Sequence, residues 1–207
     1  MDEIGVYVII TKPTLPYGKI AEICVRNNVK MLQLREKHLD DRSQLKIARE
    51  IKSVINGSQT MLCIDDRPDI AVLSQADCLH LGQTDLSIED ARKITGNNIK
   101  IGLSTHSIEQ AKVALTKNPD YIGFGPVYPT TTKEIPDPVV GCENLKKVIE
   151  FSNVPVVAIG GIFPENIDNI IATGAKTFCL VRYLMQTEDF EPRLQQLQKK
   201  LAKSINK

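Results

Sequence analysis

The stretch MLCIDDRPDIAVLSQADCLHLGQ, residues 61–83, contains the repeating unit that decides the fold. Residues 61–64 and 78–81 are short apolar runs, which are typical of buried strands. Residues 68–73 lie between them, begin with proline and have the length of one short helix. The order strand, helix, strand predicts two parallel strands that are joined by a helical crossover.

The same unit recurs along the whole chain. The predicted strands are residues 6–10, 31–35, 61–64, 78–81, 100–104, 121–124, 156–159 and 177–181. The predicted helices are the amphipathic stretches 20–25, 44–55, 68–73, 88–94, 108–115, 145–151, 167–172 and 190–205. Eight successive units predict an α/β fold of the (β/α)8 TIM-barrel type, formed by a single domain, 1–207. A doubly wound sheet shares the same local pattern and is the alternative.

The composition limits the classes of partner. The 207 residues are 42% hydrophobic and 25% charged, with a net charge of +1, which is typical of a globular domain with one core. There is no block of Lys or Arg and only 5% of the residues are aromatic, so the sequence lacks the features of nucleic-acid and anionic-membrane binders. We therefore expect small-molecule partners, with no nucleic acid and no membrane.

The N-terminus and the cysteines indicate a cytoplasmic protein. The first residues, MDEIGVYVIIT, carry acids where a secretory signal has bases, and their apolar run is too short to span a bilayer. The five cysteines include no CxxC pair and do not suggest a disulfide framework. We expect them to be reduced packing residues.

Polar residues gather at the ends of the predicted strands, where barrels of this type build their active sites. In QLREK, residues 33–37, the side chains of Gln33, Arg35 and Lys37 lie two residues apart and therefore point to one side of the strand. Those of Leu32 and Leu34 point to the other side. An arginine and a lysine that face the interior require an anionic partner. The alternative is a solvated strand end with a local ion pair to Glu36.

Two aspartates follow neighbouring predicted strands. Asp66 comes after residues 61–64 and Asp85 after residues 78–81, so the two carboxylates are expected within reach of one another. Such a sparse pair suits Mg²⁺, which takes one or two protein carboxylates and completes its shell with water and phosphate oxygens. The alternative is that these aspartates cap the helices that begin near Pro68 and Ile88, and the two roles are compatible.

A first group of phosphate-binding residues is expected after the sixth strand. The loop 125–141, GPVYPTTTKEIPDPVVG, is long for a compact domain, and loops of this length are usually functional, so we expect a lid over the barrel mouth. Within it, Thr130, Thr132 and Lys133 supply two hydroxyls and a cation.

A second group is expected after the seventh and eighth strands. In AIGGI, Gly160 and Gly161 can present backbone N–H groups to an anion, and Pro164 is expected to open a helix whose N-terminus favours negative charge. Val181 and Arg182 are expected at the end of the neighbouring strand. The alternative for the glycines alone is a tight turn. The chain is thus expected to have two anion pockets, one at the second and sixth strands with the metal and another at the seventh and eighth. Two such pockets predict two phosphorylated substrates.

The three histidines differ in their expected roles. His38 is expected in a loop, and His80 is expected to be a core histidine with satisfied hydrogen bonds. His106 follows the strand 100–104 and faces the mouth, where a role as acid or base is open to it.

The motifs QLREK, DDRPDIA, HLGQTDL, IGLSTHS, DYIGFGPVYPTTTK and AIGGI together resemble those of thiamine phosphate synthase in order and spacing, over nearly the whole chain. This family condenses hydroxymethylpyrimidine diphosphate with a thiazole phosphate, or with its carboxylated form. The resemblance implies that the products are thiamine phosphate and pyrophosphate, that Mg²⁺ is required and that the carboxylated form also releases CO2. It implies dissociative chemistry, in which a pyrimidine methylene cation forms before the thiazole nitrogen captures it. It also implies a homodimer.

The resemblance implies a role for each candidate residue. Gln33, Arg35 and Lys37 would bind the diphosphate, Asp66 and Asp85 would hold Mg²⁺, Lys133 would meet the leaving pyrophosphate, Ser104 would lie near the pyrimidine, and Thr130, Thr132, Gly161, Val181 and Arg182 would bind the thiazole phosphate. Of these, Arg35, Ser104 and Lys133 are the candidate catalytic residues.

Two positions depart from the family pattern, and two rival functions remain. Asp65, a further candidate for substrate binding, stands where members commonly have Asn, and Arg182 stands where some have Ser. One rival is a thiazole tautomerase of the same family, which would use His106 and need no metal. The other rival is a non-catalytic phosphate-binding regulator. The charged residues of the expected diphosphate site favour the synthase.

Overall fold

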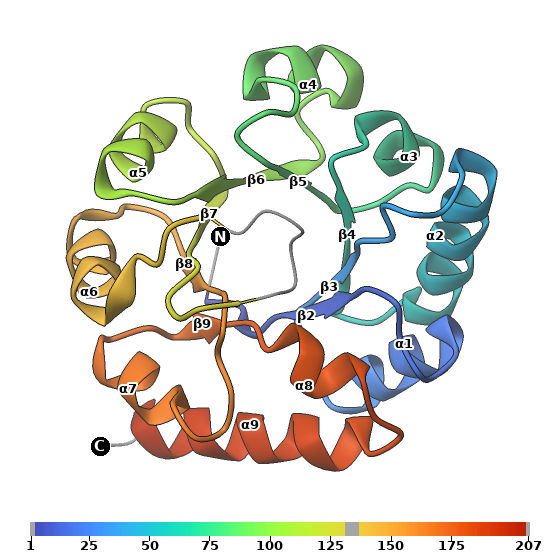
Figure 1. Cartoon of the computed structure of the whole chain (residues 1–207). Coiled ribbons are helices and arrows are strands. Elements are labelled where there is room, and N and C mark those ends of the chain that lie inside the picture. Colours follow the sequence, from blue (N-terminus) through green and yellow to red (C-terminus); the bar gives the residue numbers. More distant parts are fainter. Residues whose placement is uncertain (1–2, 131–136, 206–207) are drawn as a thin grey trace.

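A computed structural model describes residues 3–130 and 137–205 of the chain. Its strands form one parallel nine-stranded sheet, in the order β1-β9-β8-β7-β6-β5-β4-β3-β2, that curves into the barrel viewed along its axis in Figure 1. The strands β1 (Gly5–Val6) and β2 (Val8–Ile10) are consecutive parts of the first predicted strand. Because β1 pairs with β9 and β2 pairs with β3, the first strand closes the barrel. The predicted (β/α)8 fold is confirmed.

The helices surround this sheet, each after its strand. The remaining strands are β3 (Met31–Leu34), β4 (Met61–Asp65), β5 (Cys78–Leu81), β6 (Lys100–Thr105), β7 (Tyr121–Phe124), β8 (Val156–Ala158) and β9 (Thr177–Phe178). The helices are α1 (Tyr17–Arg26), α2 (Asp41–Ile55), α3 (Pro68–Leu73), α4 (Ile88–Thr95), α5 (Ile108–Leu115), α6 (Gly141–Phe151), α7 (Ile167–Ala172), α8 (Val181–Met185) and α9 (Phe190–Ile205). In Figure 1, α9 occupies the outer ring between α7 and α1.

The core has two layers because side chains alternate across each strand. On β3, Leu32 and Leu34 pack toward the helices, in the larger buried cluster. Met31 belongs instead to a second cluster that fills the barrel interior, together with Ile4, Tyr7, Ile9, Cys63, Cys78, Tyr121, Val157 and Cys179. The prediction that Leu32 and Leu34 point to the opposite side of the strand from Gln33 is therefore confirmed.

Side-chain caps start several helices close to the strand ends. Asp40 accepts a hydrogen bond from Ser43 N at the start of α2, Ser87 from Asp90 N at the start of α4, and Ser107 from Gln110 N at the start of α5. Each cap satisfies one of the backbone N–H groups that a helix start leaves unpaired.

The last strand is shorter than predicted. Residues 177–181 were expected to be extended, but β9 ends at Phe178 and Val181 already begins α8, which the sequence did not predict. Strand β9 pairs with β8 through the single pair Ala158–Phe178. Because the ladder ends there, the chain is free to turn into a helix at the rim of the barrel.

The helix expected to open at Pro164 begins later. Helix α7 starts at Ile167, after a turn in which Phe163 N donates to the side-chain oxygen of Asn166 at 2.9 Å and Asn166 N donates to the carbonyl of Phe163 at 3.1 Å. These two bonds hold residues 163–166 in a turn, so the prediction of a helix start at Pro164 was wrong.

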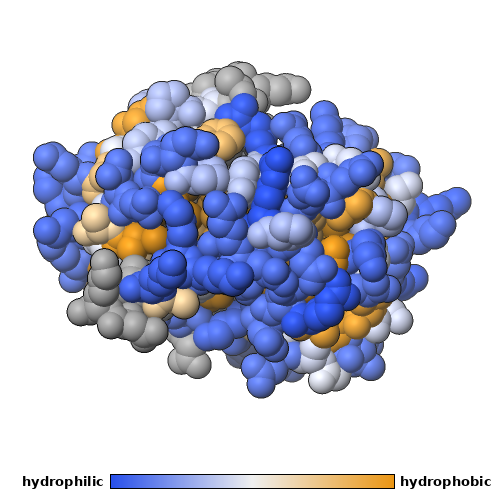
Figure 2. Space-filling model, turned by 90° about the horizontal axis from the view of Figure 1, so that it is seen from below, coloured by the Kyte–Doolittle hydropathy of each residue, from blue (hydrophilic) through white to orange (hydrophobic). Residues whose placement is uncertain are grey.

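The cysteines and the surface agree with the composition. All five cysteines are free, and all but Cys142 are buried. The face drawn in Figure 2 is mostly hydrophilic, with hydrophobic residues in small, separate areas. Within the described residues, no helix has both the length and the apolar character that a membrane span requires.

Candidate active site

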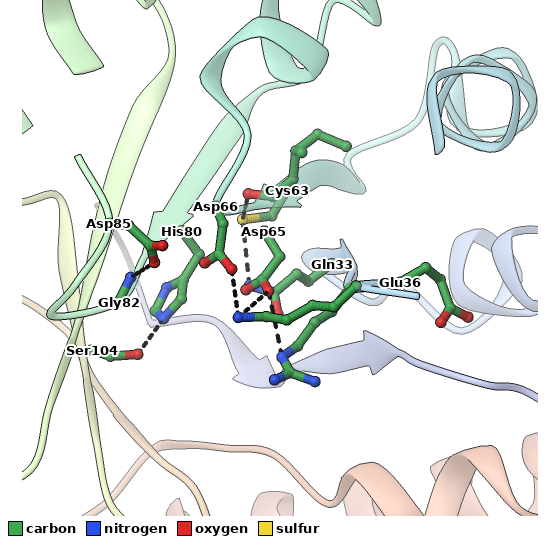
Figure 3. A network of polar contacts seen from close by, with 12 residues as sticks. Gln33, Glu36, Cys63, Asp65, Asp66, His80, Gly82, Asp85 and Ser104 are labelled. Atoms are coloured by element: carbon green, nitrogen blue, oxygen red, sulfur yellow. Dashed lines mark hydrogen bonds and ion pairs between the residues drawn. The ribbon is translucent and has the colours of Figure 1, made fainter. Parts of the chain in front are cut away.

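A cavity opens at the carboxyl ends of the strands and collects most of the predicted site residues. Those that line it are Gln33, Arg35, Asp65, Ser104, Thr130, Gly161, Val181 and Arg182. Asp66 lies beside Asp65 in Figure 3, and Lys37 forms ion pairs with both aspartates. Thr132 and Lys133 lie outside the described residues, as does much of the loop that the sequence predicts as a lid.

The cations on and after β3 pair with carboxylates on and after β4. The guanidinium Nε of Arg35 is 3.4 Å from Asp65 Oδ2, and Lys37 Nζ is 3.8 Å from the same oxygen. Lys37 Nζ also lies 2.5 Å from Asp66 Oδ2. Both cations therefore meet at the carboxylate of Asp65, the last residue of β4.

The alternative of a local ion pair with Glu36 is wrong. Glu36 is buried and points away from Asp65 and Asp66 in Figure 3. Its Oε1 accepts hydrogen bonds from Lys12 N at 2.8 Å and from the Tyr17 hydroxyl at 2.9 Å. Glu36 therefore binds the segment that follows β2 and does not pair with Arg35, whose side chain lines the cavity.

Asp65 is the least satisfied carboxylate of this cluster. Burial, followed by the charge of Asp66, raises the pKa of Asp65 to about 7, although Arg35 and Lys37 act to lower it. Its Oδ2 is buried and accepts no hydrogen bond from the described residues. An incoming anion would compete with this carboxylate for the same two cations.

Asp66 and Asp85 lie together, as predicted, but they do not cap helices. Asp85 Oδ2 accepts a hydrogen bond from Gly82 N at 2.7 Å, while the cap of α4 is Ser87. The residue at the cap of α3 is Arg67, which makes no side-chain cap hydrogen bond. The capping alternative is therefore wrong for both aspartates.

The two carboxylates share a proton-sensitive contact. Burial, followed by the hydrogen bond with Asp66, raises the pKa of Asp85. Burial also acts to raise the pKa of Asp66, but hydrogen bonds from Lys37 and Asp85 outweigh it and leave this pKa below its ordinary value. Lys37 therefore stabilises the ionised form of Asp66, whereas the contact with Asp66 disfavours ionisation of Asp85.

Asp66 and Asp85 fit the ligand requirements of Mg²⁺. Within the described part of the chain, no group of three or more His, Cys, Asp and Glu could hold a metal ion. Mg²⁺ does not need such a group, because it takes one or two carboxylates and completes its octahedron with water and phosphate oxygens. Asp66 and Asp85, beside the cations Arg35 and Lys37, are a donor set of that kind.

A different part of the cavity wall is made of glycine backbone. Gly160 and Gly161 have φ of +95° and +62°, which L side chains rarely adopt. A Cβ on Gly161 would lie 2.5 Å from the carbonyl oxygen of Pro129. The glycines thus allow the chain after β8 to pack tightly against the chain after β7, and they bring Thr130 and Gly161 to one cavity.

Arg182 faces the same cavity from α8. Its guanidinium lies 5.2 Å from the centre of the Phe163 ring, and both residues line the cavity with Gly160 and Gly161. Because Val181 and Arg182 belong to α8, they reach this wall from the first turn of a helix and not from a strand end.

His106 is held at the base of the long loop. Its Nδ1 is 2.5 Å from the carbonyl oxygen of Gly125, to which it donates, and its Nε2 is 3.5 Å from Asp137 Oδ2. His38 is exposed in a turn, as expected.

Sequence reasoning missed the residues below the cavity floor. The hydroxyls of Tyr7 and Tyr121 meet at 3.1 Å inside the barrel, and Tyr121 contacts His80. His80 has satisfied hydrogen bonds, as predicted, but it also lines the cavity. Alternation along their strands would have placed both tyrosines inside, but it does not reveal that their hydroxyls meet.

Comparison with known proteins identifies relatives over most of the chain. A family described as thiamine monophosphate synthase matches residues 6–184. The thiamine-phosphate synthase 2 of Streptococcus pneumoniae serotype 4 is 38% identical over 184 residues, which are 89% of this chain and 87% of that protein. The thiamine-phosphate synthase of Clostridium novyi is 37% identical over 189 residues, with 89% and 92% covered.

A solved structure agrees with these sequence relatives. The thiamine phosphate pyrophosphorylase of Pyrococcus furiosus matches with a TM-score of 0.84 and 30% sequence identity. The match covers 96% of this chain and 97% of that chain.

Proposed function

This chain belongs to the thiamine monophosphate synthase family and is therefore a transferase of thiamine biosynthesis, and we propose that its cavity joins two phosphorylated substrates at separate anion sites. One substrate is the hydroxymethylpyrimidine diphosphate and the other is the thiazole phosphate. The observation that supports this proposal is that two separate groups of residues suited to anions lie at one cavity. Arg35 and Lys37 form the first group, and Gly161 and Arg182 form the second.

The first site is suited to a diphosphate. Arg35 and Lys37 offer several N–H donors to phosphate oxygens, and Asp65 holds both cations in place until an anion arrives. Asp66 and Asp85 would hold Mg²⁺ next to them. When bound, Mg²⁺ supplies positive charge that stabilises the diphosphate as a leaving group.

The second site is suited to a monophosphate. Gly160 and Gly161 expose their backbone next to Thr130, and Arg182 adds a cation that Phe163 orients. The roles of Thr132 and Lys133 rest on the family resemblance alone, with Lys133 proposed to meet the leaving pyrophosphate.

The proposed reaction is dissociative. The bond between the pyrimidine methylene carbon and the diphosphate oxygen breaks, and the diphosphate leaves with the bonding electrons. The thiazole nitrogen then donates its lone pair to the methylene cation and forms the new C–N bond. The chain has to place the two substrates and stabilise the leaving group, and charged donors that are already in position do both.

The proposal is tested by removing the two carboxylates. In the double variant Asp66→Asn/Asp85→Asn, we expect kcat/KM for condensation to fall by about 100-fold or more, because the leaving group loses its metal. Circular dichroism and thermal unfolding should show a folded protein. Unchanged activity would contradict the Mg²⁺ assignment.

A matched control separates charge loss at the site from charge loss in general. The double variant Asp69→Asn/Asp90→Asn removes two carboxylates that lie on α3 and α4 and pair with Arg67 and Lys93. It should keep the activity of the unmodified chain and the same dependence on Mg²⁺.

We also propose a cytoplasmic location and a homodimer. The free cysteines support the location, because such thiols persist in reducing compartments. Analytical ultracentrifugation would check the dimer.

A further inference from the structure

A chain of hydrogen bonds crosses the barrel interior beneath the cavity. Gln33 Nε2 donates to the Tyr7 hydroxyl at 2.9 Å, and the Tyr7 and Tyr121 hydroxyls are 3.1 Å apart. The Tyr121 hydroxyl is 2.9 Å from His80 Nδ1, and His80 Nε2 is 2.8 Å from Ser104 Oγ. The chain thus connects β3 to β6 through side chains of the first strand, β7 and β5. Figure 3 shows its two ends near the aspartates.

The middle of this chain is buried and tightly packed. Tyr7 is 1% exposed and Tyr121 is fully buried. The Tyr121 ring stacks on His80 at a centroid distance of 5.5 Å and packs over Gly102, where a Cβ would lie 2.1 Å from the ring. Because a buried hydroxyl without a partner costs about 1 to 3 kcal/mol, each of these groups is held to its neighbours.

The contacts also fix which group donates. A neutral imidazole has one N–H donor and one nitrogen acceptor, whereas a thiol sulfur is a weak acceptor. Tyr121 has three groups within reach, the Tyr7 hydroxyl at 3.1 Å, Cys63 Sγ at 3.6 Å and His80 Nδ1 at 2.9 Å. Because the Tyr7 hydroxyl accepts from Gln33, its own proton is directed to the Tyr121 oxygen, and the Tyr121 proton goes to the imidazole nitrogen. The hydrogen of His80 is then on Nε2, which donates to Ser104 Oγ.

The two ends of the chain face the cavity with opposite polarity. Gln33 Nε2 is used by the Tyr7 hydroxyl and by Cys63 Sγ at 3.8 Å, which leaves the amide oxygen as an acceptor. Ser104 Oγ already accepts from His80, so its own hydrogen is available for donation. Gln33 and Ser104 both line the cavity.

We propose that Tyr7, Tyr121 and His80 are positioning residues that set the hydrogen-bonding polarity of Gln33 and Ser104 toward the pyrimidine. An aminopyrimidine has an amino group that donates and ring nitrogens that accept, which is the complement of an amide oxygen and a hydroxyl hydrogen. The identity of this ligand rests on the proposed function. The direction of the chain of hydrogen bonds follows from the contacts alone and does not rest on the proposed function.

Breaking the chain in the middle should weaken the use of one substrate only. In Tyr121→Phe, we expect kcat/KM for the pyrimidine diphosphate to fall about tenfold, which corresponds to the loss of one oriented hydrogen bond. The KM for the thiazole phosphate should not change. Tyr7→Phe should act in the same direction, which keeps the test valid if one variant folds poorly.

Cys78→Ala is the matched control. Cys78 belongs to the same interior cluster and is buried, but it takes no part in the chain of hydrogen bonds. Its variant should keep both KM values. Equal kinetic effects of Cys78→Ala and Tyr121→Phe would show that only packing matters and would overturn the proposal.

The His80 end allows a test by rescue. His80→Phe keeps a ring but removes both nitrogens, and it should lower kcat/KM for the pyrimidine diphosphate about tenfold. His80→Gln restores an N–H donor at the end of the side chain and should recover part of this loss. If the Gln variant is no better than the Phe variant, donation to Ser104 is not the function of His80.

The direction can be measured without any activity. Long-range ¹H–¹⁵N NMR of the unmodified chain at pH 8 distinguishes the two imidazole tautomers. We expect the hydrogen of His80 on Nε2, and a hydrogen on Nδ1 or on both nitrogens would overturn the proposal. If the unmodified chain fails to condense the substrates, the proposed function fails while this measurement still tests the hydrogen-bond direction.

Discussion

Asp65 pairs with two cations but is incompletely hydrogen-bonded. It pairs with Arg35 and Lys37, yet one of its oxygens is buried without a hydrogen bond from the described residues. A buried carboxylate that is incompletely satisfied is costly, because its ionised form loses water. Ionisation of Asp65 therefore costs stability.

This cost predicts a pH-dependent effect of Asp65→Asn. The pKa of Asp65 rises from 3.8 to about 7 on folding, so the stability that this carboxyl contributes is fully present below pH 3.8 and is lost as the pH rises through about 7. Asn does not ionise. The free energy of unfolding of the variant, relative to the unmodified chain, should therefore increase between pH 5 and pH 8 by at least about 1 kcal/mol.

Urea denaturation at both pH values, without metal or substrate, measures this difference. Asp41→Asn is the control, since the hydrogen bond with Arg67 lowers the pKa of Asp41 and it stays ionised throughout this range. Its effect should be the same at both pH values. A pH-independent effect of Asp65→Asn would show that burial does not govern this carboxyl.

Arg182 provides a second prediction at the scale of one residue. In Arg182→Ser, we expect the KM for the thiazole phosphate to rise about tenfold, because a charge-assisted hydrogen bond to phosphate is lost. The KM for the pyrimidine diphosphate should stay the same. Steady-state kinetics with each substrate varied in turn distinguishes the two.

Arg193→Ser is the matched control for this change. Arg193 also lies over an aromatic ring, that of Tyr183 at 4.6 Å, but it is on α9 and away from the cavity lining. Its substitution should leave both KM values unchanged. Equal effects of the two arginine variants would contradict a phosphate-binding role for Arg182.

At the scale of elements, the turn after β8 determines the shape of the second anion site. Gly161→Ala should lower thermal stability and raise the KM for the thiazole phosphate, because a Cβ there meets the backbone of Pro129 and Tyr128. We expect a loss of at least about 2 kcal/mol, more than the 1 to 2 kcal/mol of a left-handed residue alone.

Gly57→Ala measures the backbone cost separately. Gly57 also has a positive φ, +77°, but nothing lies within 4 Å of its Cβ position. Thermal unfolding of both variants should therefore show the smaller loss for Gly57→Ala, with unchanged kinetics. Equal losses would mean that the tight packing at Gly161 has no energetic effect.

The elements were predictable where a local pattern decides them. Alternation along β3 placed Gln33 and Arg35 inside and the leucines outside, and the aspartates after β4 and β5 met as expected. The end of β9 was not predictable, because it depends on how many residues of β9 pair with the neighbouring strands β1 and β8. The start of α7 depends on a side-chain turn at Asn166 that competes with the helix signal of Pro164.

The site was predictable in its charged parts and not in its buried parts. Charged residues at strand ends stand out in a sequence, since they interrupt apolar runs. The tyrosines of the interior chain do not, because a tyrosine in an apolar run has the same pattern whether its hydroxyl meets a partner or not. Only the curvature of the closed barrel brings Tyr7 and Tyr121 together from separate strands.

At the scale of the whole molecule, closure of the barrel brings the two proposed anion sites to one cavity. The first strand joins β9 to β3, so the wall that carries Gly161 and Arg182 and the wall that carries Arg35 and Lys37 belong to one continuous sheet. Two substrates that are held on these walls can meet above the barrel interior. The synthase assignment depends on this meeting, whereas a tautomerase needs a single substrate.

The most direct test is the product balance of the purified chain with each substrate alone and with both, in Mg²⁺ and after chelation. The synthase assignment predicts that thiamine phosphate and pyrophosphate form in equal amounts, only when both substrates and Mg²⁺ are present. Metal-independent isomerisation of a thiazole phosphate without condensation would contradict it in favour of a tautomerase. Tight binding of both compounds without turnover would contradict it in favour of a regulator.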